Sequence, residues 1–213
     1  MIGIFGGTFD PVHYGHIKPA LSVKQALNLT QIRFIPNRVP PHREAPWLSV
    51  DQRLALLKTA LKNHPDVIVD QRELDREGPS YMVDTLRSLR RDFPHETLVL
   101  IIGMDAFLKI TLWHQWKSLF DLCHLVVTTR PGFDHKTLAE HMSAADYRFL
   151  TEKMTSDVDL LKPQETGKIL LKSVPQLDIS STHIRSCLLK GEEVSQWMPE
   201  QVYMQLRDFI YDD

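Results

Sequence analysis

Two histidines follow a pair of glycines near the start of the chain, in the stretch GIFGGTFDPVHYGHIKP at residues 3–19. Gly6 and Gly7 carry no Cβ, so their backbone amides can approach a ligand closely. His13 and His16 are three residues apart, a spacing that puts both imidazoles on one face at the start of a helix. Imidazole N–H groups and the free amides of a helix N-terminus both donate to phosphate oxygens. The stretch therefore predicts a phosphate-binding site.

This stretch also allows other interpretations. It has neither the Gly-Lys-Ser/Thr ending of a P-loop nor the G-x-G-x-x-G dinucleotide fingerprint. Two histidines can ligate zinc, although no third ligand with a suitable motif accompanies them, and they can also be incidental to a glycine turn. Lys18, further along the predicted helix, either assists with the phosphates or is an exposed surface lysine.

A second predicted helix start, near the other end of the chain, also combines a polar cap with a cation. Ser180, Ser181 and Thr182 carry hydroxyl groups of the kind that cap helices. No Glu or Gln completes a capping box, and Arg185 lies in the first turn, where the positive end of the helix dipole disfavours a cation. A bound phosphate would remove this penalty, so Arg185 is a candidate phosphate ligand. A serine cap beside a surface arginine is the alternative.

The elements that must position these residues alternate between apolar strands and helices. The predicted strands are residues 1–5, 31–36, 66–70, 97–103, 124–130 and 167–174. The predicted helices are residues 15–28, 50–62, 80–92, 181–191 and 199–211, with a partly helical excursion at 131–155. Continuous apolar strands are typical of a parallel sheet that is covered on both faces. We therefore predict an α/β fold, a Rossmann-like doubly wound parallel sheet, in a single domain over residues 1–213.

Such sheets bind ligands beyond the carboxyl ends of their strands, at the point where the strand order reverses. The polar candidates lie there in the sequence: residues 6–16 follow the first strand, 37–43 the second and 103–105 the fourth, and Arg130 ends the fifth. The second of these segments belongs to a loop with several prolines, which limit its conformational freedom and help to hold its polar groups in place.

The composition narrows the classes of partner. The chain has 213 residues and a net charge of −2, whereas proteins that bind nucleic acid in general are usually basic. Cys123 and Cys187 show no zinc-type spacing and are expected to be two buried thiols in a reducing compartment. No signal-type start and no apolar run of membrane-spanning length occurs, so we expect a soluble cytoplasmic protein.

Two motifs carry a family resemblance. The segment TFDPVHYGH at residues 8–16 and the segment ISSTHIR at 179–185 resemble the two signatures of the nucleotidyltransferase superfamily, in the same order. Members join a nucleoside monophosphate unit to a phosphate acceptor and release pyrophosphate. The segments PNRVPPHRE, GPSYMVDTL, IIGMDAF and RPG extend the likeness over essentially the whole chain, to the bacterial nicotinate-nucleotide adenylyltransferases.

The resemblance implies a reaction and an ATP site. ATP and nicotinate mononucleotide would give nicotinate adenine dinucleotide (deamido-NAD) and pyrophosphate, a step of NAD biosynthesis, with Mg²⁺ accompanying the ATP and no protein metal site. His16 would stabilise the transition state with support from His13, and Arg185 would contact the β- and γ-phosphates. The implied ATP-binding residues are Gly6, Gly7, Thr8, Phe9, His13, His16, Ser180, Ser181, Thr182 and Arg185.

The resemblance also implies an acceptor site, formed by Asn37, His42, Arg43, Asp105 and Trp113. Each of these assignments has an alternative. His42 and Arg43 can belong to a solvated basic loop. Asp105 can be a helix cap, and Trp113 can pack in the core. Two positions depart from the family. Met82 stands where members commonly carry a threonine that helps to hold the nicotinate carboxylate, and His114 stands where they carry a tyrosine.

Other functions are compatible with these residues. The acceptor could be nicotinamide mononucleotide, because Met82 cannot donate a hydrogen bond to a carboxylate. A pantetheine-phosphate adenylyltransferase or a cytidylyltransferase is a more distant enzyme alternative. A regulatory module that binds nucleotide without turnover is an alternative from another class. The expected partners are the small-molecule substrates, with no nucleic acid and no membrane, and the expected state is a monomer or a homodimer.

Overall fold

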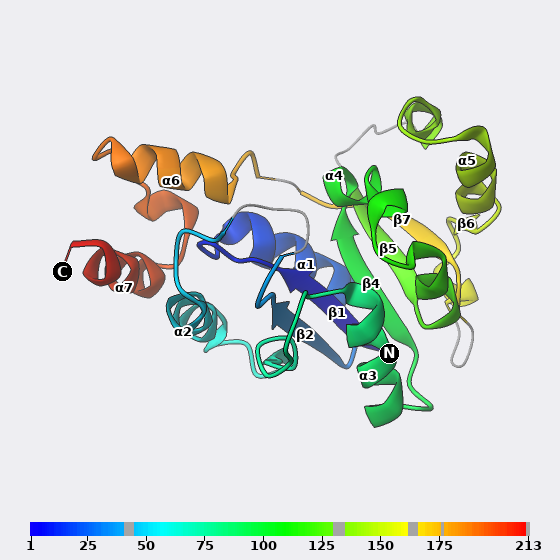
Figure 1. Ribbon diagram of the computed structural model, residues 1–213, viewed down its shortest axis with the longest axis horizontal. Helices are drawn as coiled ribbons and strands as arrows, with labels where there is room; N and C mark the ends of the chain where they lie inside the picture. Colours follow the sequence, from blue (N-terminus) through cyan, green and yellow to red (C-terminus); the bar gives the residue numbers. More distant parts are fainter. Residues whose placement is uncertain (41–44, 130–134, 162–165, 176, 212–213) are drawn as a thin grey trace.

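The computed structural model describes residues 1–40, 45–129, 135–161, 166–175 and 177–211. Within these ranges one parallel sheet of seven strands has the order β3-β2-β1-β4-β5-β7-β6 (Figure 1). The strands are β1 (Ile2–Gly7), β2 (Gln31–Pro36), β3 (Val67–Val69), β4 (Leu98–Gly103), β5 (His124–Thr129), β6 (Met154–Thr155) and β7 (Ile169–Ser173). The sheet confirms the predicted doubly wound α/β fold, and its order reverses between β1 and β4.

Helices cover both faces of the sheet. They are α1 (Tyr14–Ala26), α2 (Val50–Leu61), α3 (Met82–Asp92), α4 (Met104–Phe107), α5 (Ala144–Thr151), α6 (Ser181–Leu189) and α7 (Glu200–Tyr211). In Figure 1 the helices α1, α2, α6 and α7 gather on one side of the molecule, whereas α3, α4 and α5 lie on the other. Short 3₁₀ turns at Ile110–Leu112 and Trp116–Asp121 follow α4.

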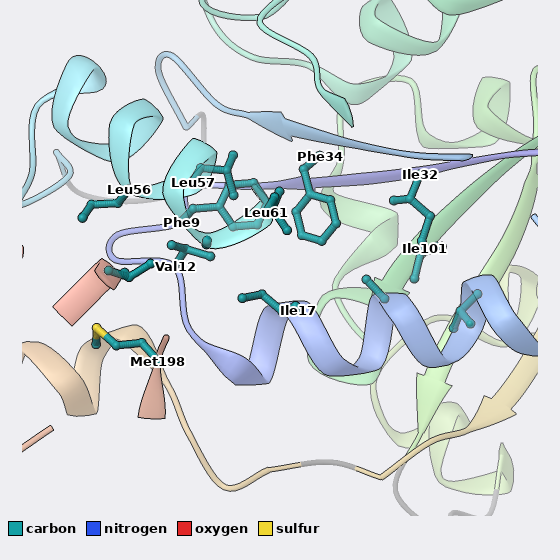
Figure 2. Packing of buried hydrophobic residues seen from close by; sticks show 14 of the residues in the cluster. Phe9, Val12, Ile17, Ile32, Phe34, Leu56, Leu57, Leu61, Ile101 and Met198 are labelled. Atoms are coloured by element: carbon teal, nitrogen blue, oxygen red, sulfur yellow. The ribbon is translucent and has the colours of Figure 1, made fainter. Parts of the chain in front are cut away.

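The alternation of side chains along the strands builds two apolar cores. In β4, Val99 and Ile101 belong to the core under α1, α2, α6 and α7, whereas Leu98, Leu100 and Ile102 belong to the core under α3, α4 and α5. Figure 2 shows the first core, with Ile17 of α1 on one side of the strands that carry Ile32, Phe34 and Ile101. A strand buried on both faces must be apolar at every position, which is why β4 is a continuous apolar run.

Local sequence sets the starts of the helices that border the site. Ser49 begins α2 with a complete capping box, because its hydroxyl accepts the Gln52 N–H and the Gln52 side chain accepts the Ser49 N–H. Ser180 caps α6 by accepting the His183 N–H at 3.1 Å, which confirms the predicted serine cap. His13 is the N-cap of α1, a role that the sequence did not suggest.

The structure adds several details to the sequence prediction. β6 has only two residues and lies within the region expected to be partly helical, so no apolar run indicated it. The four-residue α4 and the 3₁₀ turns are too short to show a periodic pattern. Cys123 and Cys187 are both buried and unpaired, as predicted. No helix in the described ranges is long and apolar enough to cross a membrane.

Candidate active site

A large open cleft of about 1660 Å³ lies at the carboxyl ends of β1 and β4, where the strand order reverses. This volume exceeds that of a typical pocket for a single small ligand, and it leaves room for two nucleotides. Nearly all of the predicted site residues line the cleft: Gly6, Gly7, Thr8, Phe9, His13, His16, Asn37, Asp105, Trp113, Ser180, Ser181, Thr182 and Arg185. Topology thus brings together residues from both ends of the chain.

His13 is held in a neutral state at the start of α1. Its Nδ1 accepts the backbone N–H of Gly15 at 3.0 Å, so in the neutral ring Nε2 carries the proton. The side chain is buried, and this desolvation lowers the pKa of His13 to about 4. His13 therefore offers an N–H donor at neutral pH and does not add a positive charge to the site.

His16 lies one turn further along α1, with its ring stacked on that of His13. The two ring centroids are 3.8 Å apart with an interplanar angle of 30°. The edges of Phe5 and Phe9 also face His16, at centroid distances of 6.5 and 5.2 Å. The glycine between the histidines is required sterically, because a Cβ on Gly15 would lie 2.9 Å from the His13 ring. The imidazole pair is therefore fixed by stacking and by close backbone packing.

The second motif lies directly against the first. Arg185 of α6 donates through Nη1 to the Asp10 carbonyl at 2.6 Å, and the same nitrogen is 3.4 Å from the Asp10 carboxylate. The Ser181 hydroxyl donates to the Pro11 carbonyl at 3.1 Å. The N-termini of α1 and α6 therefore both line the cleft, with histidine donors from one and a guanidinium from the other.

Asp10 joins three segments around the cleft, and the sequence prediction did not assign it to the site. Its carboxylate accepts the backbone N–H groups of Trp47 and Leu48, at 2.8 and 2.9 Å, besides contacting Arg185. The buried Arg53 of α2 supports the same loop, because its Nη1 donates to the Thr8 carbonyl at 2.8 Å. A charged residue on the apolar face of a predicted helix was the signal that could have indicated Arg53.

The other side of the cleft is formed by α3, α4 and the segment after α4. Asp105 lies in the first turn of α4, and its carboxylate folds over Gly103, where a Cβ would be 2.7 Å from Oδ1. Gly103 is the N-cap of this helix, so Asp105 is not the helix cap that was the alternative. Trp113 is half-buried, lines the cleft and also packs against the core under α3, as the core-packing alternative expected, while its contact with the acceptor stays a prediction.

The two positions at which the sequence resemblance predicts other residues, Met82 and His114, lie on this side. The methyl group of Met82 lies against Gly6 of β1, since a Cβ at Gly6 would be 2.6 Å from it. The ring of His114 stacks on the ring of Tyr81, with centroids 4.3 Å apart and an interplanar angle of 26°. Both residues line the cleft. Through Met82, the α3 side of the cleft is therefore in contact with Gly6 near the carboxyl end of β1.

Behind this side lies a buried carboxyl group that the sequence prediction missed. Glu73 is buried at the base of the cleft, and the Thr85 hydroxyl donates to its Oε1 at 2.5 Å. Burial raises the pKa of the Glu73 carboxyl, and the hydrogen bond from Thr85 opposes this rise. The contact ties the segment that precedes α3 to the second turn of that helix. Ser80, next to it, accepts the Arg38 N–H at 3.0 Å.

Some predicted residues are not part of this description. His42, Arg43 and Arg130 lie outside the described residues. Lys18 is exposed, with its Nζ 4.7 Å from the centroid of the Tyr14 ring, and it is not among the residues that line the cleft. Within the described ranges, no three His, Cys, Asp or Glu side chains are grouped so as to hold a metal ion.

Comparisons with known proteins agree with this arrangement. A model of the cytidylyltransferase-like family matches residues 4–187. A relative from Acidithiobacillus ferrooxidans, named as a nicotinate-nucleotide adenylyltransferase, is 44% identical over 199 residues, covering 93% of this chain and 89% of the relative. A relative of the same name from Methylococcus capsulatus is 45% identical over 203 residues, covering 95% of this chain and 94% of its own. The chain belongs to the nicotinate-nucleotide adenylyltransferase family.

Membership of the nicotinate-nucleotide adenylyltransferase family confirms the resemblance drawn from the two motifs. A solved structure of the Plasmodium falciparum nicotinic acid mononucleotide adenylyltransferase, complexed with NaAD, is similar in fold, with a TM-score of 0.71 over 99% of this chain and 96% of that one. At 16% sequence identity this likeness supports the fold alone. The assignment of the chain to the nicotinate-nucleotide adenylyltransferase family therefore rests on the two sequence relatives described above.

Proposed function

We propose that the chain transfers the adenylyl group of ATP to nicotinate mononucleotide, giving nicotinate adenine dinucleotide and pyrophosphate in NAD biosynthesis. The observation that carries this proposal is the meeting of the two motif helices at one cleft, where Arg185 of α6 contacts Asp10, just before His13 of α1. Relatives that share about 40% identity over most of their length bear the name of this activity.

The proposed ATP site is on the α1 and α6 side of the cleft. The N-terminal ends of α1 and α6, which favour an anion through the helix dipole, lie there, and Gly6 and Gly7 let the nucleotide approach the main chain. Thr8, Phe9 and the three hydroxyl residues 180–182 complete this wall. The proposed acceptor residues are Asn37, Asp105 and Trp113, which line the same cleft, together with His42 and Arg43 outside the described residues.

In the proposed reaction, a phosphate oxygen of the acceptor mononucleotide attacks the α-phosphorus of ATP in line. A new P–O bond forms while the bond to the bridging oxygen of the β-phosphate breaks, and pyrophosphate leaves with that electron pair. The protein need not supply a nucleophile, so its residues act by positioning and by stabilising negative charge. His16 and Arg185 are the proposed donors to the charge that develops on the phosphates.

His13 has a different part in this proposal. Because Nδ1 is occupied by the Gly15 N–H, only Nε2–H remains to donate, and the ring stays neutral at physiological pH. The stacked arrangement fixes the orientation of the His16 ring. In this proposal Arg185 of α6 supplies a positive charge to the phosphates. His13 orients the ring of His16 and adds one neutral N–H donor.

Mg²⁺ is proposed to enter with ATP as part of the substrate. A magnesium ion is usually held by substrate phosphates and water with one or two protein oxygens. We also propose that the chain acts in the cytoplasm as one domain, either as a monomer or as a homodimer. Its net charge of −2 favours small-molecule partners over nucleic acid.

One assay tests the function. The protein is incubated with ATP, Mg²⁺ and either nicotinate or nicotinamide mononucleotide, pyrophosphate release is followed, and the dinucleotide is identified by mass. We expect pyrophosphate release when ATP and a mononucleotide are both present, with a higher kcat/KM for nicotinate mononucleotide than for nicotinamide mononucleotide. A higher value for the nicotinamide compound would identify the alternative enzyme. ATP binding without pyrophosphate release with any acceptor would identify a non-catalytic module.

A further inference from the structure

One buried carboxylate connects the phosphate side of the cleft to the segment between β2 and α2. Asp10 is 5% exposed and accepts the backbone N–H of Trp47 at Oδ2 and that of Leu48 at Oδ1, at 2.8 and 2.9 Å. The same Oδ2 lies 3.4 Å from Nη1 of Arg185. A main-chain amide and a guanidinium therefore share one oxygen of this carboxylate.

A second guanidinium lies near Asp10 without replacing these donors. The Nη1 of the buried Arg53 donates to the Thr8 carbonyl at 2.8 Å, and within the described ranges its Nε and Nη2 have no hydrogen-bond partner. Attraction to the Asp10 carboxylate opposes the lowering of the pKa of Arg53 by burial. Arg53 thus contributes positive charge near Asp10, while the hydrogen bonds come from Trp47, Leu48 and Arg185.

Arg185 is divided between Asp10 and the cleft. Its Nη1 donates to the Asp10 carbonyl at 2.6 Å, and its Nη2 donates to the Thr182 hydroxyl at 3.3 Å. The side chain is 29% exposed and lines the cleft. A guanidinium binds phosphate oxygens in paired, charge-assisted hydrogen bonds. In the proposed function, on which this inference rests, the β- and γ-phosphates of ATP therefore draw Arg185 away from the Asp10 carboxylate.

The loss of Arg185 changes what the other two hydrogen bonds are worth. Within the described part of the chain, the amides of Trp47 and Leu48 are then the donors that remain to the Asp10 carboxylate. A buried carboxylate without hydrogen bonds is strongly unfavourable, so breaking these two bonds costs more when Arg185 is occupied by phosphates. Bound ATP therefore makes it harder for Trp47 and Leu48 to separate from Asp10.

The segment that Asp10 holds is part of the wall of the cleft. Residues 45–47 line the cleft, and so does Asn37, a proposed acceptor residue at the start of the same connection between β2 and α2. The N–H of Asn37 donates to the Gly7 carbonyl at 3.0 Å, which fixes that end to β1. The other end depends on Asp10, so the shape of this wall follows the state of its carboxylate.

We propose that Asp10 is a positioning residue that couples the binding of the two substrates. When the phosphates of ATP engage Arg185, Asp10 holds Trp47 and Leu48 more firmly, and the acceptor binds to a wall that is already in place. Such coupling is reciprocal, so a bound acceptor increases the affinity for ATP by the same factor. Asp10 itself contacts neither substrate in this proposal.

Calorimetric titration measures this coupling. The Kd of nicotinate mononucleotide is determined with and without a saturating ATP analogue that has a methylene group between its α- and β-phosphates, which prevents transfer. We expect the analogue to lower this Kd about tenfold in the wild-type protein and less than about twofold in Asp10→Asn, which keeps one acceptor oxygen and loses the charge. A merely structural role would weaken binding without changing this ratio. Asp121→Asn, at an exposed position outside the cleft, should keep the wild-type ratio.

A second measurement needs no variant and decides the question if Asp10→Asn does not fold. Hydrogen exchange of the Trp47 and Leu48 amides is followed by NMR in the wild-type protein. We expect the saturating analogue to slow exchange about fivefold or more, and AMP, which lacks the β- and γ-phosphates, to slow it less than about twofold. Equal slowing by both nucleotides, or by neither, would overturn the inference.

The proposed function and the role of Asp10 fail in different ways. If the wild-type protein turns over neither mononucleotide, the proposed function is wrong and the coupling of substrates is wrong with it. If the wild-type protein is active and the analogue leaves the Kd of nicotinate mononucleotide unchanged, or lowers it equally in Asp10→Asn, only the role of Asp10 is wrong.

Discussion

The two sides of the cleft are built in different ways. On the α1 and α6 side, side chains are held by main-chain groups: His13 by the Gly15 N–H, Ser180 by the His183 N–H and Arg185 by the Asp10 carbonyl. On the α3 side, contacts between side chains predominate, as in the stacking of Tyr81 on His114 and the hydrogen bond from Thr85 to Glu73, although Ser80 accepts a main-chain N–H. Main-chain partners persist when side chains are substituted. The first side is therefore suited to a fixed reaction, and the second to a choice of acceptor that can change by substitution.

Substitution of His16 should produce the largest effect and tests the phosphate side. We expect His16→Ala to lower kcat by about 10²-fold or more while the affinity for ATP stays within about an order of magnitude, because a donor to developing charge is lost. Steady-state kinetics and nucleotide titration measure the two quantities. His95→Ala, at an exposed position outside the cleft, is the matched control. An unchanged kcat would remove His16 from the chemistry.

The pH dependence of stability tests whether burial keeps His13 neutral on the α1 side of the cleft. The pKa of His13 is lowered from 6.5 to about 4 in the folded protein, so on acidification the unfolded chain takes up the proton first. The stabilisation is present above pH 6.5 and is lost as the pH falls toward 4. Between pH 7 and about 4.5 we expect a loss on the order of 2 kcal/mol from this group.

Urea unfolding of the wild-type protein and of His13→Asn measures this loss. Asparagine also caps helices but does not titrate, so the stability of the variant should fall less on acidification. His95→Asn removes an exposed histidine and should follow the wild-type curve. Parallel curves for wild type and His13→Asn would show that His13 is not neutralised by burial.

The smallest expected effect concerns the acceptor side. Met82→Thr introduces a hydroxyl group that can donate a hydrogen bond to a carboxylate, and we expect it to raise the kcat/KM ratio of nicotinate over nicotinamide mononucleotide by about threefold. Met204→Thr, at an exposed position of α7, is the control. A change in kcat of the size expected for His16→Ala would break the distinction between the two sides, because Met82 also touches Gly6.

The sequence predicted the sheet well because each buried strand is a continuous apolar run between recognisable helices. It also predicted which segments meet, since residues after β1, β2 and β4 necessarily share one edge of a parallel sheet. The single-domain organisation and the roles of the site residues stay predictions. The two-residue β6 escaped prediction, because hydrogen bonding to β7 defines it and its own sequence does not.

Other features depend on contacts between distant residues. The neutral state of His13 follows from its burial at the start of α1, whereas the sequence indicated only an imidazole able to donate to phosphate. The links from Asp10 to Trp47, Leu48 and Arg185 join segments far apart in the chain. The polar partner of the buried Arg53 is a backbone carbonyl, which no pattern of side chains can reveal.

The contact between Arg185 and Asp10 has a consequence for competing anions. In the free protein this guanidinium is already partly satisfied by a carbonyl and a carboxylate. An isolated inorganic phosphate or sulfate ion must compete with both partners at a single position, whereas a nucleotide brings several anchored groups to the cleft at once. We therefore expect simple anions to inhibit weakly. When pyrophosphate leaves, the Arg185 guanidinium can return to its contacts with Asp10, which favours product release.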